Sequence, residues 1–391
     1  MSATEAEDLL PFVDPVFWHD PYPYYDRVRE LTPVYASPAG VHVVTRYEDV
    51  APLLRDGRLS SLELSFGVGD RFHNSVLGQD PPDHTRLRKV FQKWFGRSRV
   101  LQWAADTTER VNASLDAAEA RGGRLDIFDD YAFPATFGTI SYMFGVGTDA
   151  ALDCRRATYT IGRALAPGAT EADMAAGEAE FGWYYDYIRG LIRQKQEQPG
   201  DDLLTTFVQA MDEGVMNEEE VLATMVLLYA VGHLDNSYLM ANGILRLLND
   251  PALKQRYLDD PAIRGSVIQE LLRHETPEQF VVRAATADIE VGGEVIPNEA
   301  VVMLMIGAAN RDPSIFPNPA EFDVDRDNLV KQIAFGGGIH TCIGSALAMA
   351  QGETAITTFF ERYPDARLDG EVEFAHTEFL RVIAHMPVRL N

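Results

Sequence analysis

A glycine-rich stretch near the end of the chain carries one cysteine and runs directly into a helical pattern. It reads Phe-Gly-Gly-Gly-Ile-His-Thr-Cys-Ile-Gly from Phe335 to Gly344. Three successive glycines, of which Gly336 is the first, permit positive φ angles and a close approach of the backbone to a flat partner. A cysteine at the start of a helix lies near the positive end of the helix dipole, which favours the thiolate. Cys342 is therefore a candidate metal ligand.

The alternative is that Cys342 is a small buried apolar residue, as single cysteines often are. The spacing Phe-Gly-x-Gly-x-His-x-Cys-x-Gly argues against this, and the whole string resembles the haem-binding loop of the cytochrome P450 family. The resemblance implies haem b as the cofactor, Cys342 as the axial iron ligand, and Phe335, Gly336 and Gly344 as residues that contact the haem. Zinc is a poorer candidate, because structural zinc sites use four Cys or His ligands and the only other cysteine is Cys154.

Composition limits the remaining possibilities. The 391 residues are 46% hydrophobic, which is enough to build a core around a cofactor. Two cysteines allow no disulfide framework, and the acidic residues 1–8 do not resemble a secretory signal, so we expect a cytoplasmic protein. The longest strongly apolar run, Val221 to Val231, is too short to cross a bilayer. A net charge of -25 argues against binding to nucleic acid. We therefore expect neither a membrane nor a nucleic acid as partner.

The order of patterns along the chain predicts a mainly α fold with small β-sheets. Helical apolar spacing dominates residues 82–272, with breaks at Gly-Gly and Pro-Gly pairs. The predicted strands are residues 34–36, 41–44, 288–291, 294–296 and 300–304, and a Thr45 to Glu48 capping box is expected to open a helix after the first hairpin. The resemblance implies a single cytochrome P450 domain over 1–391, with the haem between a long central helix and the cysteine loop.

An acid and a base lie three residues apart at Glu270 and Arg273, so they can pair on one helix face. Taken alone, the spacing is typical of an exposed ion pair of little energetic value. Its place upstream of the cysteine loop matches the Glu-x-x-Arg motif of the P450 family. The resemblance implies a structural role, with Arg326 as the third member of the network.

The propionates of a haem need cationic or strongly hydrogen-bonding partners. His84 and Arg88 are four residues apart on a helix predicted to begin near Pro82, a pattern that is also typical of a solvated basic face. Together with Arg283 and His340, they match the propionate ligands of P450s. The resemblance therefore assigns all four to cofactor binding.

The central helix departs from the family pattern. P450 monooxygenases usually carry an acid followed by a threonine there, and the two help to deliver protons during oxygen activation. The flanking sequence aligns Leu234 with the acid, Asp235 with the threonine and Asn236 with the residue after it. Asp235 and Asn236 are thus the candidate catalytic residues.

Three readings of this departure stay open. In the first, Asp235 itself relays protons while Asn236 or Ser237 orders water. In the second, a hydroxyl or amine of the substrate supplies the missing group. In the third, the enzyme performs unusual chemistry such as cyclisation, coupling, rearrangement or peroxide-driven oxidation. A plainer alternative is that Asp235 is an acid bonded to a neighbour such as His233.

The resemblance implies a haem-thiolate monooxygenase that oxidises a small to medium organic molecule in specialised metabolism. Ferredoxin and ferredoxin reductase are the expected electron donors, and Lys93, Arg97, Arg99 and Lys331 are candidates for their docking, although they also fit ordinary solvated charge. The rivals are a P450-fold enzyme without net oxygen insertion and a non-catalytic haem-binding protein. Family position gives the candidate pocket residues as Phe66, Phe72, Tyr229, Gly232, Gln279 and Phe379.

Overall fold

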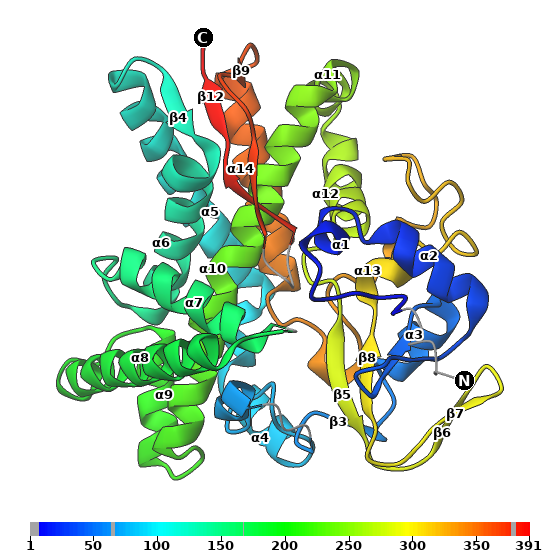
Figure 1. Ribbon diagram of the computed structural model, residues 1–391. Helices are drawn as coiled ribbons and strands as arrows, with labels where there is room; N and C mark the ends of the chain where they lie inside the picture. The colour runs from blue at the N-terminus through cyan, green and yellow to red at the C-terminus, as the bar shows by residue number, and fades with distance from the viewer. Residues whose placement is uncertain (1–7, 64–66, 167, 377–380) are drawn as a thin grey trace.

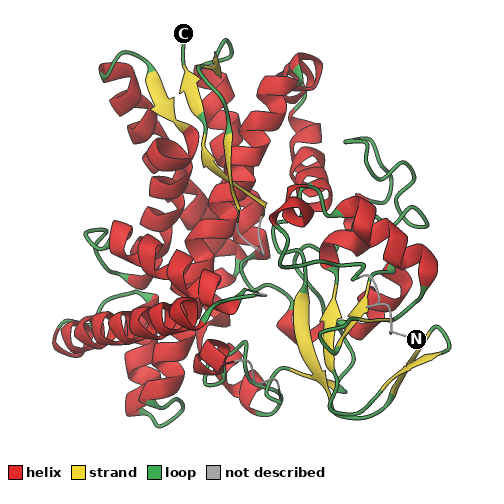
Figure 2. Cartoon of the chain, in the orientation of Figure 1, coloured by secondary structure: helices red, strands yellow, loops and turns green. Residues whose placement is uncertain are grey.

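The structure is a computed structural model that describes residues 8–63, 67–166, 168–376 and 381–391. Figure 2 shows that helices make up most of the chain and that the strands gather in small sheets. The helices are α1 Pro15–His19, α2 Tyr22–Leu31, α3 Tyr47–Leu53, α4 Asp83–Phe91, α5 Arg97–Ala120, α6 Phe133–Phe144, α7 Ala151–Leu165, α8 Glu171–Glu197, α9 Leu203–Asp212, α10 Glu218–Asn249, α11 Pro251–Asp259, α12 Arg264–His274, α13 Ile306–Ala309 and α14 Ser345–Arg362. The predicted mainly α class is confirmed.

Helix α10 runs through the middle of the helical part, with α5, α6, α7 and α14 beside it in Figure 1. Its start is fixed by a capping box in which Asn217 accepts from the Glu220 backbone N–H and Glu220 accepts from that of Asn217. Apolar residues surround most of the helix, and those from Val221 to Ala230 are buried. A helix that is apolar all round is typical of the centre of a large domain.

The largest sheet has the order β1-β2-β8-β5-β3 and lies beside the N-terminal helices. Its strands are β1 Tyr35–Ala36, β2 Val41–Val44, β3 Leu59–Ser60, β5 Val281–Ala285 and β8 Val301–Leu304. The predicted hairpin is confirmed, with Tyr35 opposite Val43 in antiparallel register. Strand β2 then pairs in parallel with β8, so one sheet contains strands from residues 35–60 and from residues 281–304.

Two further groups of strands are smaller. Strands β4 Arg124–Asp126, β12 Pro387–Arg389 and β9 Arg367–Leu368 form an antiparallel sheet, and β10 Glu373–His376 pairs with β11 Arg381–His385. The predicted hairpin β6 Ile289–Val291 and β7 Glu294–Ile296 is also present.

The capping box predicted at Thr45 is wrong, although a helix does follow. Helix α3 begins at Tyr47, its N-cap is Arg46, and no side chain within that segment caps it. The Tyr47 backbone N–H instead donates to Asp312, 265 residues away, at 2.9 Å. A distant carboxylate therefore accepts a hydrogen bond from the start of the helix, in place of the predicted local cap.

Candidate cofactor site

The cysteine loop has a left-handed backbone conformation, which favours glycine, at two points. Gly336 and Gly338 take φ values of 69° and 68°. A Cβ on Gly338 would also lie 2.7 Å from the Leu54 carbonyl oxygen, so the loop packs directly against the end of α3. The Cys342 backbone N–H donates to the Phe335 carbonyl at 2.9 Å and closes the turn before α14 begins.

The Cys342 side chain is exposed, whereas that of Cys154 is buried. Burial of the loop raises the pKa of the Cys342 thiol, the Gly344 backbone N–H lowers it, and the charges of Asp235, Arg88 and Glu278 act on it as well. The Gly344 N–H at the start of α14 thus acts in the expected direction, toward the thiolate, while burial acts against it. A coordinated metal ion deprotonates a thiol outright, so iron bound to Cys342 would itself stabilise the thiolate form of that residue.

Arg88 holds the cysteine loop from α4. Its guanidinium donates to the carbonyls of Ile339 and Thr341, both at 2.7 Å. Ile339 and Thr341 are the two neighbours of His340, so Arg88 fixes the backbone on either side of that histidine. The predicted propionate partner is thus also a support of the loop.

Of the three further predicted partners, His84 and Arg283 have polar atoms with little else to bind, whereas His340 Nε2 lies 3.4 Å from the Ser61 hydroxyl. His84 is 3% exposed, and neither of its ring nitrogens has a hydrogen-bond partner. Its ring lies 4.6 Å from that of His340, centroid to centroid. Arg283 is half-buried, donates to the Val282 carbonyl, and has no carboxylate within ion-pair distance among the residues that the structure describes. An unpaired cation and orphaned imidazole nitrogens suit an anionic ligand.

Burial and positive neighbours decide how these groups titrate. Burial lowers the pKa of His340 to about 3, helped by the charges of Arg283, His84 and Arg88. Burial also lowers the pKa of His84, and that of Arg283 to about 10. Both imidazoles are therefore neutral near pH 7 while Arg283 remains charged. This donor set, with one free cysteine nearby, fits a haem with two propionates and a thiolate ligand.

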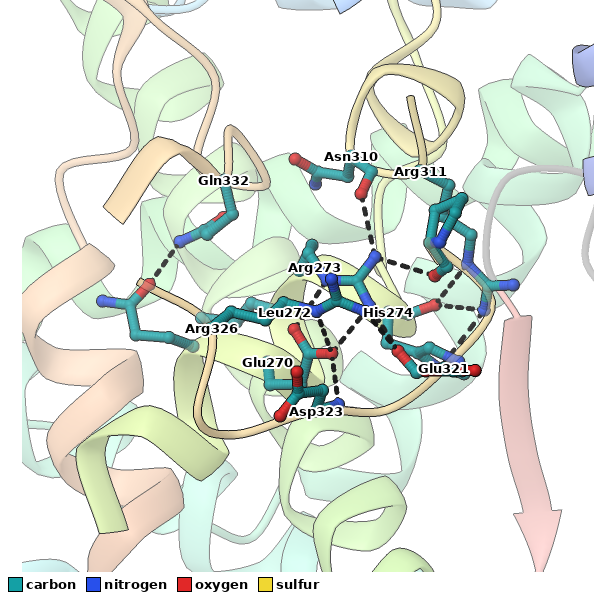
Figure 3. A network of polar contacts seen from close by, with 12 residues as sticks. Glu270, Leu272, Arg273, His274, Asn310, Arg311, Glu321, Asp323, Arg326 and Gln332 are labelled. Carbon is teal, nitrogen blue, oxygen red and sulfur yellow. Dashed lines mark hydrogen bonds and ion pairs between the residues drawn. The ribbon is translucent and has the colours of Figure 1, made fainter. Parts of the chain in front are cut away.

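The structure brings Glu270, Arg273 and Arg326 together, as Figure 3 shows. Glu270 and Arg273 are both 0% exposed and form two hydrogen bonds, at 2.6 and 2.7 Å. Arg326 contacts Glu270 at 3.2 Å. The two guanidinium groups also donate to backbone carbonyls of the irregular segment, at Asn310, Pro317, Asn318, Pro319 and Glu321.

On α10, the residues that replace the usual acid and alcohol differ in their surroundings. Leu234 is buried in the core. Asp235 is half-buried and makes no hydrogen bond or ion pair with any described residue, so the alternative in which His233 binds it is not seen. Burial raises the pKa of Asp235 to about 7. His233 instead contacts the Tyr229 carbonyl through Nδ1.

The Asn236 side chain points toward α14. It is 7% exposed and its amide donates to Gln351 of α14 at 2.6 Å, and Gln351 in turn donates to Thr107 of α5 at 2.8 Å. The predicted role in ordering water beside Asp235 is not supported by this placement, because the amide N–H is used in a bond between helices. The other amide atom of this side chain, Asn236 Oδ1, has no hydrogen-bond partner among the described residues.

Glu278 stands beside the predicted pocket residue Gln279 and is a further acid to be considered with it. It is half-buried, directly precedes Gln279, and has no hydrogen bond or ion pair within the described part of the chain. Burial raises its pKa well above the usual range, and the charge of Asp235 raises it further. Asp235 and Glu278 therefore influence each other and both influence Cys342.

Three predicted pocket residues make packing or hydrogen-bond contacts with neighbouring elements. The Tyr229 hydroxyl is 2.8 Å from that of Ser141 on α6, and a Cβ on Gly232 would lie 3.0 Å from Ile140 of the same helix. Gln279 is 3% exposed and donates to the Thr276 carbonyl. Of the others, Phe72 packs against Phe181 at 5.0 Å, and Phe66 and Phe379 lie outside the described residues.

Comparison with known proteins places this geometry in a family. A family model described as Cytochrome P450 matches residues 265–372, which include the Glu270 network and the cysteine loop. The protein named Cytochrome P450 107B1 from Saccharopolyspora erythraea is 33% identical, with 100% of this chain and 99% of that protein covered. The chain belongs to the cytochrome P450 family. It is thus a P450 oxidoreductase with a haem-iron cofactor.

Other relatives of this P450 carry the names of hydroxylases. The 6-deoxyerythronolide B hydroxylase of the same species is 30% identical, with 99% of this chain and 100% of the relative covered. The vitamin D(3) 25-hydroxylase of Pseudonocardia autotrophica is 31% identical, with 100% and 98% covered. These relatives support a P450 monooxygenase.

Solved structures confirm the P450 fold. P450BioI in complex with hexadec-9Z-enoic acid ligated acyl carrier protein has a TM-score of 0.90 at 28% identity, with 96% of this chain and 100% of that chain covered. The enzyme CxnD for C–S bond formation in chuangxinmycin biosynthesis has a TM-score of 0.85 at 27% identity, with 95% and 94% covered. No helix in the described ranges combines the length and the apolar character needed to cross a membrane.

Proposed function

We propose that residues 1–391 form one haem b domain, acting in the cytoplasm, that oxidises a small to medium organic molecule in specialised metabolism. The observation that carries the proposal is the accessible Cys342 thiol on its Arg88-supported loop, electrostatically linked to the unpaired Asp235 of α10. Haem held by Cys342 supplies the centre that activates dioxygen. His84, Arg88, Arg283 and His340 are the proposed propionate partners.

The chain's own contribution to the chemistry is proposed to centre on Asp235. Its carboxylate is not held by any described side chain, and a pKa of about 7 lets it bind and release a proton near neutral pH. Asp235 therefore has the properties of a proton relay in place of the usual acid and alcohol. Asn236 supports this position indirectly, by tying α10 to α14 through Gln351.

We propose ferredoxin and its reductase as the electron donors. Lys93, Arg97 and Lys331 are exposed and suit an acidic partner. Arg99 contributes less, because its charge is paired with Asp201 at 2.8 Å and its guanidinium lies over the Trp94 ring.

A second candidate function is oxidation without oxygen insertion, such as cyclisation or bond formation between two substrate atoms. The observation that favours it is the replacement of the acid and alcohol by Leu234 and Asp235. The similarity to an enzyme for C–S bond formation adds support.

One experiment separates the two functions. Compounds that shift the haem spin state are first selected from a metabolite library and then incubated with redox partners under heavy-isotope oxygen gas. Monooxygenation predicts one labelled oxygen atom in the product. A product without label supports the second function, and compounds that bind but are never turned over would contradict both.

A further inference from the structure

A chain of hydrogen bonds runs from Asn236 of α10, the residue beside Asp235, to the surface of α5. The Asn236 amide donates to Gln351 of α14 at 2.6 Å, and the Gln351 amide donates to Thr107 of α5 at 2.8 Å. The Thr107 hydroxyl lies 3.3 Å from that of Thr139 on α6. The chain therefore joins side chains of four helices, which lie side by side in Figure 1.

The chain ends at an acid that is itself held in place. The Thr139 hydroxyl donates to Asp106 of α5 at 2.7 Å, and Asp106 accepts two hydrogen bonds from Arg110, at 2.7 and 3.1 Å. The Asp106 side chain is 12% exposed and that of Arg110 is 31% exposed, whereas the threonines and amides of the chain are buried. Asp106 is thus the solvent-facing end of an otherwise buried chain of contacts.

Asp106 sets the direction of the hydrogen bonds at its end of the chain. A carboxylate paired with a guanidinium can only accept, so the Thr139 hydroxyl hydrogen points toward Asp106. Thr139 thereby turns a lone pair toward Thr107. The Thr107 hydrogen is shared between Thr139 and the Trp103 carbonyl oxygen, 2.9 Å away, so Thr107 is left as an acceptor on its other side.

The same direction continues through the two amides. Thr107 accepts from the Gln351 N–H, which turns the Gln351 oxygen toward Asn236. Asn236 then presents its N–H to Gln351 and keeps its oxygen, Oδ1, on the opposite side. That oxygen is buried and has no hydrogen-bond partner among the described residues. Hydrogen bonds that point the same way strengthen one another, so the chain opposes a flip of either amide.

The bond from Asn236 lies at one end of a line of close contacts between α10 and α14. Farther along both helices, a Cβ on Gly352 would lie 3.0 Å from Leu239, and Ile356 fills the space that a side chain on Gly243 would need. The two helices advance together along this line, so they run in the same direction. The part of α10 before Asn236 therefore lies level with the start of α14, which follows the cysteine loop.

We infer that this chain positions the part of α10 that carries Asp235. Its members are positioning residues, and one of them acts from the protein surface: Asp106, Thr139, Thr107 and Gln351. The inference rests on the proposed function and deepens it, because it explains how Asp235 is held for its proposed role. Successive residues of a helix are about 100° apart around its axis, so holding Asn236 against α14 also fixes the direction in which Asp235 points.

The test uses the infrared stretching band of carbon monoxide bound to the reduced, haem-loaded protein. The frequency of this band responds to the polar groups that face the bound molecule, so no substrate is needed. Asp235→Asn is the reference variant and should shift the band. Gln351→Leu breaks the chain in its middle and should also shift or split the band, while the far-UV dichroism and the Soret band of the adduct stay unchanged. In the Asp235→Asn background Gln351→Leu should have a smaller effect, because the carboxyl group that it displaces is absent.

A buried control separates positioning from a general loss of packing. Tyr131→Phe removes a buried hydroxyl that donates to the Ala355 carbonyl of α14 at 2.6 Å, without a bond to α10. It should leave the carbon monoxide band in place.

Asp106→Asn tests the far end of the chain. Asparagine has the shape of aspartate but can donate as well as accept, so the direction of the chain is no longer fixed and both orientations of the Asn236 amide become populated. We expect two bands in place of one. Asp116→Asn is the matched control, since it makes the same change on the same helix, where Asp116 pairs with Arg362 at 2.7 Å outside the chain. It should leave the band unchanged.

Three results would overturn the inference. In the first, Gln351→Leu leaves the band unchanged or shifts it no more than Tyr131→Phe does. In the second, the effect of Gln351→Leu is equally large in the Asp235→Asn background. In the third, Asp106→Asn gives the same spectrum as Asp116→Asn.

Failure of this inference is distinguishable from failure of the proposed function. If Asp235→Asn shifts the band but the chain variants do not, only the positioning role is wrong. If Asp235→Asn does not shift it either, the proposed role of Asp235 is wrong as well. If the reduced carbon monoxide adduct lacks the spectrum of a thiolate-bound haem, the proposed function itself is wrong.

Discussion

Removing Glu270 should destabilise the fold far more than removing an exposed acid, because it leaves a buried charge unpaired. In Glu270→Ala, Arg273 loses the two bonds at 2.6 and 2.7 Å, and the Asp323 backbone N–H loses its acceptor at 2.8 Å. Arg273 would keep only backbone carbonyls around a guanidinium that is 0% exposed. Breaking one side of a buried ion pair costs about 3–5 kcal/mol.

That cost is a large part of the stability of a typical protein, which is about 5–15 kcal/mol. With a urea m-value of about 3 kcal/mol/M, the unfolding midpoint should fall by about 1–2 M. The assay is urea unfolding of the haem-loaded protein, followed by far-UV circular dichroism and by the Soret band. Haem should also be lost at lower urea, because the network holds the segment that leads into the cysteine loop (Figure 3).

Two further variants separate charge from packing. Glu270→Gln keeps the shape of the side chain but not its charge, so it should be nearly as destabilising as Glu270→Ala. Asp325→Ala removes the exposed partner of Arg256, whose bond is 2.8 Å long, and should shift the midpoint little. A midpoint for Glu270→Ala that matches that of Asp325→Ala would refute the argument.

The remaining predictions concern the cofactor and the distal carboxylate. His84→Phe keeps a ring in the same buried place but removes both unpartnered nitrogens, so we expect weaker haem retention with little change in far-UV dichroism; full retention would contradict the propionate role. Asp235→Asn should raise the fraction of electrons lost as hydrogen peroxide by about tenfold or more, as loss of a proton-transfer group does; unchanged coupling would exclude the relay. The same variant should raise the unfolding midpoint more at pH 8 than at pH 4. The folded-state pKa of about 7 lies above the ordinary 3.8, so ionisation of Asp235 costs stability as pH rises through that window; an equal gain at both pH values would contradict this.

The proximal half of the site could be predicted because its residues are close in sequence or occur in fixed order. The glycines around Cys342 and the three-residue spacing of Glu270 and Arg273 each leave a local pattern. A positive φ at Gly336 and a buried pair at 2.6 Å are the structural reasons for those patterns. The chemistry of the cysteine loop and the order of the motifs along the chain therefore both predicted haem.

The distal half could not be predicted from sequence, because it depends on which way each side chain faces. Tyr229 lies in a suitable stretch of α10 but faces α6, and Gln279 turns toward Tyr25.

The central claim is that Cys342 binds the haem iron as a thiolate, and the reduced carbon monoxide spectrum tests it most directly. The intact protein should show the red-shifted Soret band after which the family is named. Cys342→Ser, if it still binds haem, should lack that band. A haem-loaded wild type without the red-shifted band, or a Cys342→Ser variant that retains it, would contradict the account.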